Sequence, residues 1–509
     1  MATESLAGSV SVRAFKAVGD GVTDDRAAIQ AALNSGASEV VIPRGTYLVG
    51  RGTGYFCLTV PAGVTVRGED RDGSVLLQAP NVAASTRLLQ VAAANVTIRD
   101  VTLDGNRTRQ SADEHRAGVF ATGAPNLTLR NVVARGFTGA GFYIYLGSHN
   151  PTVDHVIATK NARNGITFGG ATTGGVVTGS SFVGNGAQQF DSEPGAGATV
   201  NGLTITGNTM DGAGASTDFV LTVSGSNGAS RSQGWTIDGN TLNGATNVVW
   251  ADNIVIRNNV GINPTIKPAL TVYRTTNNIT VQGNKWTLTQ SGTNALVGVA
   301  VIGTGTGSAP TNVTVTQNRI AITGRAPAFG LKVTGASSVS ITQNDLLGPG
   351  FAAAGYAGVY LRPTDPNDDF KSAVVQRNAI SNWGAYGVSI VGNGPARLLA
   401  VDISGNLFDD TAGTMTRAVS LDDGSGAAKQ ISLTNNTRTN GVTGLVARYP
   451  LATPVLVAGQ RGQRGTYAVA GTPEGVLVEV PGAIATHWSG NAGWRKAAGS
   501  AATGWAQTY

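Results

Sequence analysis

The sequence of 509 residues has one cysteine, Cys57, and no long apolar run. A single thiol excludes an intrachain disulfide and a metal site built from several cysteines. No segment approaches the roughly 18 consecutive apolar residues of a membrane-spanning helix, so no membrane insertion is expected. The first six residues, MATESL, lack the basic and apolar regions of a signal peptide, which predicts synthesis in a cytoplasm.

Charged and aromatic residues are also scarce, at 13% and 6% of the chain. The 36 Lys and Arg residues against 30 Asp and Glu give a net charge of +6 without a basic block, which argues against nucleic-acid binding. Acidic residues with EF-hand spacing and His-x-x-x-His pairs are absent from the sequence, so we predict no metal and no cofactor. The hydrophobic content of 41% argues against disorder, and the 71 glycines show no collagen-like period. A β-rich fold with many tight turns remains.

A short phrase recurs from about residue 200 onward: an apolar or β-branched pair, two small or polar residues, then asparagine. It reads TITGN at 204–208 and TIDGN at 236–240, and it returns at intervals of 19 to 34 residues. The further copies end at Asn259, Asn284, Asn318, Asn344, Asn378, Asn406 and Asn436. Alternation with period two and a closing asparagine are typical of a short strand followed by a turn. Variable intervals of this length favour the coils of a parallel β-helix over helix-pair repeats or a propeller.

Coils of this kind stack about 4.8 Å apart, so the recurring asparagines would lie above one another. We expect their side-chain amides to form an internal ladder of hydrogen bonds. The asparagines would then be structural rather than catalytic.

The two ends of the chain differ from the repeats. Near the N-terminus, Thr23 is a candidate N-cap for a helix that ends before Gly36 and that would cap the open end of the solenoid. After Pro454 the composition shifts, and three of the seven tryptophans lie in the last residues. We predict an N-terminal segment with a capping helix at 1–50, a parallel β-helix at 51–453 and a small C-terminal β module at 454–509. The three tryptophans are Trp488, Trp494 and Trp505.

The N-terminal motifs carry a resemblance to a known family. They read AVGDGVTDD at 17–25, AAIQAA at 27–32, VVIPRGTY at 40–47 and VTVRG at 64–68. Together they resemble the start of the pectate-lyase-like β-helix superfamily, whose members include polygalacturonase-like hydrolases, lyases and bacteriophage tail-spike proteins. The resemblance implies an all-β fold, a right-handed parallel β-helix. Modules similar to 454–509 often close phage tail proteins, which implies a tail-spike or tail-fibre type.

Two acidic residues, Asp191 and Glu193, stand out because most other acidic residues are single turn aspartates. At positions i and i+2 of a strand, both side chains project from the same face. Glycoside hydrolysis requires two carboxyl groups, one as acid and one as base or nucleophile. We predict that this pair is catalytic, whereas a solvated strand edge is the structural alternative.

A second group, Asp113, Glu114, His115 and Arg116, places two acids, an imidazole and a guanidinium in four residues. Lying one to two coils from Asp191, this loop is predicted to line the same groove, with His115 as a base and Arg116 as a clamp for a substrate carboxylate. Tyr143 and Tyr145 alternate on one strand and are predicted to add a surface for sugar stacking. A charged surface loop and ordinary packing are the structural alternatives.

These observations favour a bacteriophage tail-spike or tail-fibre protein that binds a host-surface polysaccharide and depolymerises it by hydrolysis or by lyase cleavage, of which hydrolysis is favoured. Two alternatives stay open: a receptor-binding or structural virion protein without catalysis, and a bacterial polysaccharide hydrolase or lyase. The first hypothesis predicts a homotrimer in the virion tail, in contact with other tail proteins and made in the host cytoplasm. The bacterial alternative predicts an extracellular protein.

Overall fold

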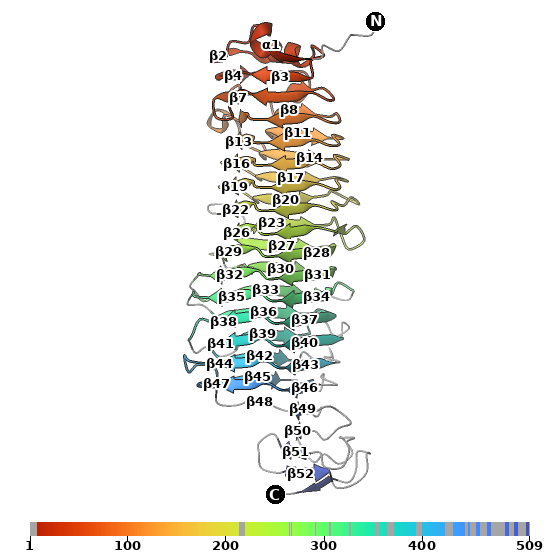
Figure 1. The fold of residues 1–509 in the computed structure, drawn as a ribbon, viewed down its shortest axis with the longest axis vertical. Helices are drawn as coiled ribbons and strands as arrows, with labels where there is room; N and C mark the ends of the chain where they lie inside the picture. Colours follow the sequence, from red (N-terminus) through yellow and green to blue (C-terminus); the bar gives the residue numbers. More distant parts are fainter. Residues whose placement is uncertain are drawn as a thin grey trace. The chain divides into compact units, whose positions relative to one another are not determined.

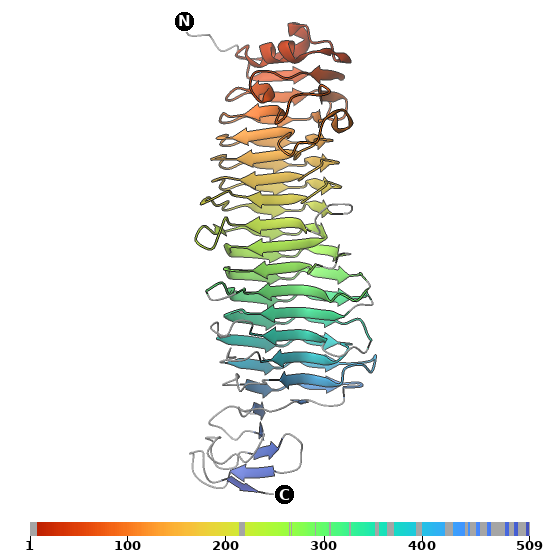
Figure 2. The same cartoon turned by 180° about the vertical axis from the view of Figure 1, so that it is seen from behind.

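The computed structural model describes residues 8–212, 219–263, 265, 267–290, 292–304, 307–324, 327–351, 356–363, 371–392, 400–422 and 431–442, with the short backbone segments 446–447, 455–458, 466–469, 484–487, 493–496 and 505–507. The chain forms two compact units, Met1–Gly261 and Ile262–Tyr509. Within each unit, short parallel strands stack coil upon coil (Figure 1 and Figure 2). The predicted all-β parallel β-helix is confirmed.

In the first unit the strands form three parallel sheets, A, B and C, and most coils contribute one strand to each. Sheet A contains β1 (Ser9–Ser11), β3 (Glu39–Ile42), β6 (Thr65–Gly68), β9 (Thr97–Arg99), β12 (Thr128–Arg130), β15 (Thr152–Asp154), β18 (Val176–Thr178), β21 (Thr204–Thr206), β24 (Ser232–Gln233), β25 (Thr236–Asp238) and β28 (Ala251–Arg257). Sheet B contains β2 (Asp20–Asp24), β4 (Gly45–Val49), β7 (Ser74–Gln78), β10 (Thr102–Asp104), β13 (Val133–Arg135), β16 (Ile157–Thr159), β19 (Ser181–Val183), β22 (Thr209–Asp211) and β26 (Thr241–Asn243). Sheet C contains β5 (Phe56–Val60), β8 (Arg87–Val91), β11 (Val119–Thr122), β14 (Phe142–Tyr145), β17 (Ile166–Gly169), β20 (Phe190–Glu193), β23 (Phe219–Ser224) and β27 (Ala245–Val249).

The second unit repeats the three-sheet arrangement. Its sheet A strands are β31 (Asn277–Gln282), β34 (Thr311–Thr316), β37 (Ser338–Thr342), β40 (Ser372–Gln376), β43 (Val401–Ser404), β46 (Ile431–Thr434) and β49 (Val455–Ala458). Its sheet B strands are β32 (Lys285–Leu288), β35 (Arg319–Ile322), β38 (Asp345–Leu347), β41 (Ala379–Ser381), β44 (Leu407–Asp409) and β47 (Thr437–Thr439), and β29 (Val260–Asn263) begins at the boundary. Its sheet C strands are β30 (Leu270–Tyr273), β33 (Leu296–Ile302), β36 (Ala328–Thr334), β39 (Ala357–Arg362), β42 (Tyr386–Val391), β45 (Arg417–Asp422) and β48 (Val446–Ala447).

Many strands alternate between inward and outward side chains, as β14 does. On β14, Phe142 and Ile144 are fully buried in the core, whereas Tyr143 and Tyr145 are only partly buried on the outer face. Stacking in parallel register places apolar side chains of successive coils on one another, as Phe142 on Ile166. Burial of this continuous apolar interior is the main stabilising term of the solenoid.

The predicted asparagine ladder is confirmed within each unit. In the first unit, the Asn208 amide donates to Asn240 at 3.0 Å, and Asn240 donates to Asn259 at 2.9 Å. In the second unit, an unbroken series of amide contacts of 2.9–3.0 Å runs through Asn284, Asn318, Asn344, Asn378, Asn406 and Asn436. Each amide inside the series also bonds a backbone carbonyl, so that the buried polar groups of this turn are satisfied.

The N-terminal capping helix is present, but its predicted N-cap is wrong. The helix α1 spans Arg26–Leu33 and its N-cap is Asp25, whereas Thr23 lies at the end of β2. The Thr23 hydroxyl is already used, since it donates to the side chain of Asp20 at 2.8 Å. The predicted N-cap failed because this turn bonds itself locally before the helix starts.

The predicted boundaries at 50/51 and 453/454 stay predictions. Strands β3 and β4 lie before residue 51 and already pair in parallel with β6 and β7. At the other end, β49 pairs with β50 (Thr466–Val469) in antiparallel orientation. β50 pairs in parallel with β51 (Ile484–His487), and antiparallel pairs join β51, β52 (Gly493–Lys496) and β53 (Trp505–Gln507). The side chains of the three C-terminal tryptophans lie outside the described part of the structure.

Three features of the fold remain. No helix in the described segments is long and apolar enough to cross a membrane. Cys57 on β5 is 2% exposed, and burial raises the pKa of its thiol to about 12. Two short 3-10 turns, η1 (Val12–Phe15) and η2 (Arg107–Arg109), complete the regular elements.

Candidate functional site

The outer face of sheet C in the first unit brings residues of successive coils into one row. Phe120 lies opposite Tyr143, Tyr143 opposite Thr167, and Thr167 opposite Asp191. Glu193 lies opposite Gly169 at the end of the same strands. Since neighbouring strands lie about 4.8 Å apart, these side chains form a continuous surface although they are more than twenty residues apart in sequence.

Glycines set the place where each coil enters this sheet. A Cβ atom on Gly141 would lie 2.7 Å from the Gly165 carbonyl oxygen and 2.9 Å from the Asn161 amide nitrogen. A side chain therefore does not fit there without movement of the neighbouring coil. The close approach holds the following strand, which carries Tyr143, in register with the coils on either side.

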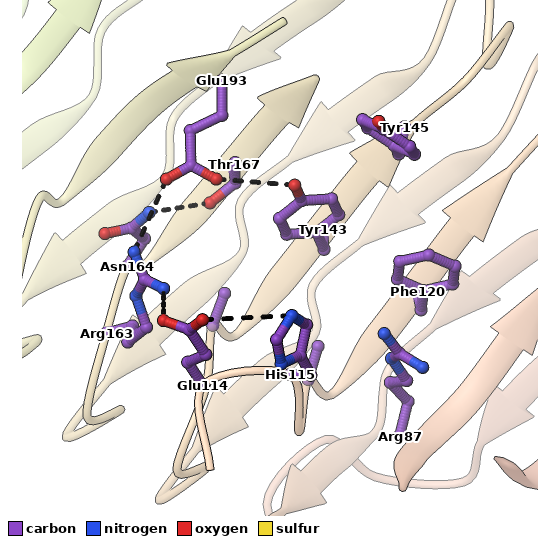
Figure 3. Close-up of a pocket in the computed structure, with 12 residues that line it drawn as sticks. Arg87, Glu114, His115, Phe120, Tyr143, Tyr145, Arg163, Asn164, Thr167 and Glu193 are labelled. Atoms are coloured by element: carbon purple, nitrogen blue, oxygen red, sulfur yellow. Dashed lines mark hydrogen bonds and ion pairs between the residues drawn. The ribbon is translucent and has the colours of Figure 1, made fainter. Parts of the chain in front are cut away.

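A pocket of about 310 Å³ opens on this face (Figure 3). Its wall combines aromatic rings, cations and carboxylates. The lining residues are Arg87, Glu114, His115, Ala117, Phe120, Ala140, Tyr143, Tyr145, Arg163, Asn164, Thr167 and Glu193. Five of the residues predicted from the sequence therefore meet here: Glu114, His115, Tyr143, Tyr145 and Glu193.

Asp191 lies directly beneath the pocket wall on β20. Its side chain is nearly fully buried, and the Asn164 amide donates a hydrogen bond of 3.0 Å to it. Burial, followed by the charge of Glu193 and a hydrogen bond with Glu193, raises the pKa of Asp191 to about 8. Near neutral pH the raised pKa favours the protonated form of Asp191.

Glu193 is the exposed member of the pair, with 40% of its side chain accessible. The Tyr143 hydroxyl donates to its carboxylate at 3.4 Å, and the Arg163 guanidinium lies 3.6 Å away on the other side (Figure 3). Burial and the nearby Glu193 charge raise the pKa of the Tyr143 hydroxyl, which stays protonated and remains a donor. The carboxylate of Glu193 thus faces the pocket between a phenol and a guanidinium.

The predicted four-residue loop divides into two parts. Glu114 and His115 line the pocket: Glu114 forms an ion pair with Arg163, and His115 lies 4.0 Å from Glu114. Asp113 does not line the pocket, and its carboxylate accepts a hydrogen bond of 2.9 Å from the backbone amide of His115, which shapes the loop.

The prediction for Arg116 is wrong. Its side chain is 1% exposed and donates to the carbonyl oxygen of Val82 at 2.9 Å and to the hydroxyl of Ser111 at 3.1 Å. These bonds anchor the loop to the neighbouring coil and direct the guanidinium into the protein. Arg116 therefore does not reach the pocket, and two other arginines, Arg87 and Arg163, supply its cations.

Aromatic rings form the floor of the pocket. Phe120 stacks on Tyr143 with ring centroids 5.7 Å apart, and Tyr145 lies 5.6 Å from Tyr143. The Arg87 guanidinium lies over the Phe120 ring, 4.5 Å from its centroid. Flat apolar rings beside hydroxyl, amide and charged groups suit a sugar ring, which has an apolar face and polar edges.

The sequence offered one unused signal for the missed residues. The coils that enter sheet C align as Gly-Val-Phe at 118–120, Gly-Phe-Tyr at 141–143 and Gly-Ile-Thr at 165–167. This alignment is enough to place Phe120 and Thr167 beside Tyr143. Arg87 and Arg163 stand outside this motif, since Arg87 begins β8 and Arg163 precedes the Gly-Ile-Thr stretch. Within the described residues, no group of three or more His, Cys, Asp or Glu side chains is arranged to hold a metal ion.

Comparisons with known proteins relate the chain to β-helix families. Residues 9–90 match the family model described as "Rhamnogalacturonase A/epimerase, pectate lyase-like". The chain is similar to mannuronan C5-epimerase AlgE1 of Azotobacter vinelandii, with 32% identity over 173 residues, which is 30% of this chain and 12% of that protein. It also resembles the preneck appendage protein of Bacillus phage PZA, with 30% identity over 126 residues, 24% of this chain and 14% of that protein.

The chain therefore spans only a small part of the curated relatives that it matches. Among solved structures, the A-module of mannuronan C-5 epimerase AlgE4 from Azotobacter vinelandii aligns over 88% of this chain and 100% of that chain, with 20% identity and a TM-score of 0.41.

Proposed function

Since the chain is a pectate-lyase-like parallel β-helix, we propose that it is a bacteriophage tail-spike or tail-fibre protein that binds a host-surface polysaccharide in the pocket on sheet C and hydrolyses its glycosidic bonds. Asp191 and Glu193 are the catalytic pair of this proposal. The similarity to phage preneck appendage proteins supports the place in a virion tail. Contact with other tail proteins and assembly as a homotrimer belong to the same proposal.

The observation that carries the catalytic part is the placement of the two carboxyl groups. Asp191 is buried, which raises its pKa to about 8, and Glu193 on the same strand faces a pocket lined with aromatic rings. Glycoside hydrolysis uses such a pair: the acid protonates the leaving oxygen, and the carboxylate activates water or attacks the sugar. Tyr143 donates a hydrogen bond to the Glu193 carboxylate and the Arg163 guanidinium lies beside it, so both contacts orient this carboxylate at the pocket.

The proposal requires one movement of a side chain. Glu193 is close enough to raise the pKa of Asp191, whereas retaining glycosidases hold the two carboxyl groups about 5–5.5 Å apart and inverting ones farther. Asp191 is buried, whereas 40% of the Glu193 side chain is exposed at the pocket. A substrate that binds the Glu193 carboxylate in the pocket would move this carboxylate away from Asp191.

The test is incubation of the purified protein with capsular and cell-wall polysaccharides. New reducing ends without unsaturated product support hydrolysis. An unsaturated uronate, detected by its ultraviolet absorbance, would instead show lyase cleavage, and retention of polymer without cleavage would show a binding protein.

We predict that Asp191→Asn and Glu193→Gln each lower kcat by about 10²–10⁴-fold, because an amide cannot exchange a proton as acid or base. Circular dichroism and the melting temperature of both variants should show a folded protein. Asp72→Asn is the matched control, since Asp72 is exposed and pairs with Arg71 outside the pocket. Turnover at the wild-type rate by both variants would overturn the catalytic assignment.

A further inference from the structure

Arg87 differs from the other cations of the pocket. Arg163 is held by Glu114 and Glu193, and His115 lies near Asp113 and Glu114. Within the part of the chain that the structure describes, Arg87 forms no side-chain hydrogen bond and no ion pair, and its Nε atom is buried without a partner. A guanidinium carries five donors, and a buried donor without an acceptor is costly.

Stacking holds this guanidinium in place. It lies 4.5 Å from the centroid of Phe120 and 5.9 Å from that of Phe56, so two aromatic rings position it. Figure 3 shows Arg87 beside Phe120 at the end of the pocket opposite Glu193. A planar cation that is already oriented loses little side-chain entropy when it binds a planar or tetrahedral anion through two parallel hydrogen bonds.

We propose that Arg87 is a binding subsite for an anionic substituent of the polysaccharide, a carboxylate or a sulfate, remote from the bond that is cleaved. Strands β8 and β20, which carry Arg87 and Glu193, are four strand-to-strand steps apart. At about 4.8 Å per step, this places their backbones about 19 Å apart along the stack. The polysaccharide would lie along the stacking direction over Phe120 and Tyr143, with its charged group at the end of the pocket opposite Glu193.

This inference rests on the proposed function, because it assigns one end of the same pocket. Its test measures binding, so it does not depend on catalysis. Wild-type protein, Arg87→Gln and Arg87→Lys are titrated with a panel of carboxylated polymers (alginate, polygalacturonate and hyaluronan), sulfated carrageenan, and neutral dextran and mannan. Arg130→Gln is the matched control, since Arg130 is an exposed arginine on sheet A, paired with Asp154.

We expect wild-type protein to bind at least one acidic polymer, with weaker binding at higher salt, and to bind the neutral polymers much less. Arg87→Gln should weaken binding of the acidic polymer by at least about tenfold, as expected for one hydrogen-bonded charge pair. Arg87→Lys keeps the charge but not the paired donors, so its affinity for the acidic polymer should lie between those of the wild type and of Arg87→Gln. The carboxylated and sulfated arms identify which anion is recognised.

The inference is overturned if no acidic polymer of the panel binds, or if Arg87→Gln binds as tightly as Arg130→Gln. Binding that depends on Arg87 without any cleavage would remove the hydrolase assignment and keep the anion subsite. Cleavage of a neutral polymer by Arg87→Gln at the wild-type rate would remove the anion subsite and keep the hydrolase assignment.

Discussion

Asp191 and Glu193 show how two identical functional groups on one strand acquire different chemistry. Both project from the outer face of β20, but Asp191 lies in the middle of the strand and Glu193 at its end. The neighbouring coil covers Asp191 with Asn164 and Thr167, whereas Glu193 lies opposite Gly169, which has no side chain to cover it. Burial therefore falls on Asp191 alone and keeps it protonated.

The raised pKa of Asp191 predicts a pH dependence of both activity and stability. In the folded protein Asp191 keeps its proton up to about pH 8, whereas an unfolded aspartate loses it near the ordinary value of 3.8. Between these values the folded state binds more protons, so the free energy of unfolding decreases as pH rises. We expect the melting temperature to fall through this range, and kcat/KM to fall as Asp191 loses its proton near pH 8.

The Asp191→Asn variant tests whether Asp191 causes this pH dependence of stability. An amide has no proton to lose in this range, so its melting temperature should be less sensitive to pH between about 5 and 8 than that of the wild type. Thermal unfolding at a series of pH values provides the measurement. Equal pH dependence of the two proteins would show that another group is responsible.

Sequence reasoning reached part of this site and missed the rest for a physical reason. The i, i+2 spacing was enough to place Asp191 and Glu193 on one face, because strand geometry is local. Which of them is buried depends on Asn164, and the direction of Arg116 depends on Val82 in another coil. Contacts between coils are long-range in sequence, and loops of unequal length separate the partners.

At the scale of the element, the asparagine turn is the feature that sequence predicted best. A phrase that ends in asparagine is a local signal. Once the coils stack, the asparagines of successive phrases lie above one another and form the ladder. The capping helix was predicted from local signals too, among them Gly36 after its end. Its start was not, because the hydrogen bonds of Asp20 to Thr23 compete with the helix for the same groups.

The ladder predicts that the loss of one asparagine side chain strongly lowers the free energy of unfolding. Asn344 donates to the Val315 carbonyl and to Asn378, and its side-chain oxygen accepts from the backbone amide and side chain of Asn318, all in the interior. Asn344→Ala removes these bonds and leaves buried groups unpaired, so we expect the free energy of unfolding to fall by about 2–3 kcal/mol.

A surface amide of similar chemistry provides the control. Gln282 bonds Gln317 at 2.8 Å on the exposed side of the second unit, where water replaces a lost partner. Gln282→Ala should change stability by no more than about 0.5 kcal/mol. Denaturant unfolding of both variants tests the ladder, and equal stabilities would contradict its structural role.

At the scale of the whole molecule, the open question is assembly. A β-helix buries its core within one chain, so a monomer is physically possible. A tail-spike role favours a closed trimer with three-fold symmetry. With one buried cysteine per chain, such a trimer would be held by packing rather than by a disulfide.

We predict a homotrimer whose stability depends on residues after about 455, because the clustered tryptophans there provide large apolar surfaces in few residues. Light scattering of the full-length chain and of a chain ending near residue 450 measures the change. A full-length monomer at micromolar concentration would contradict both the trimer and the tail-spike proposal. A trimer that survives truncation would place the contact on the β-helix itself.

Cys57 can report local unfolding of the N-terminal coils. A thiol reacts as the thiolate, and a side chain that is 2% exposed with a pKa of about 12 offers neither access nor ionisation while the first coils are closed. Modification by a thiol reagent must therefore wait for local unfolding around β5, as amide hydrogen exchange does. Because it is the only cysteine in the chain, every labelled molecule records one such event at one place. The rate of labelling therefore measures how often the N-terminal coils unfold locally, without any mutation of the protein.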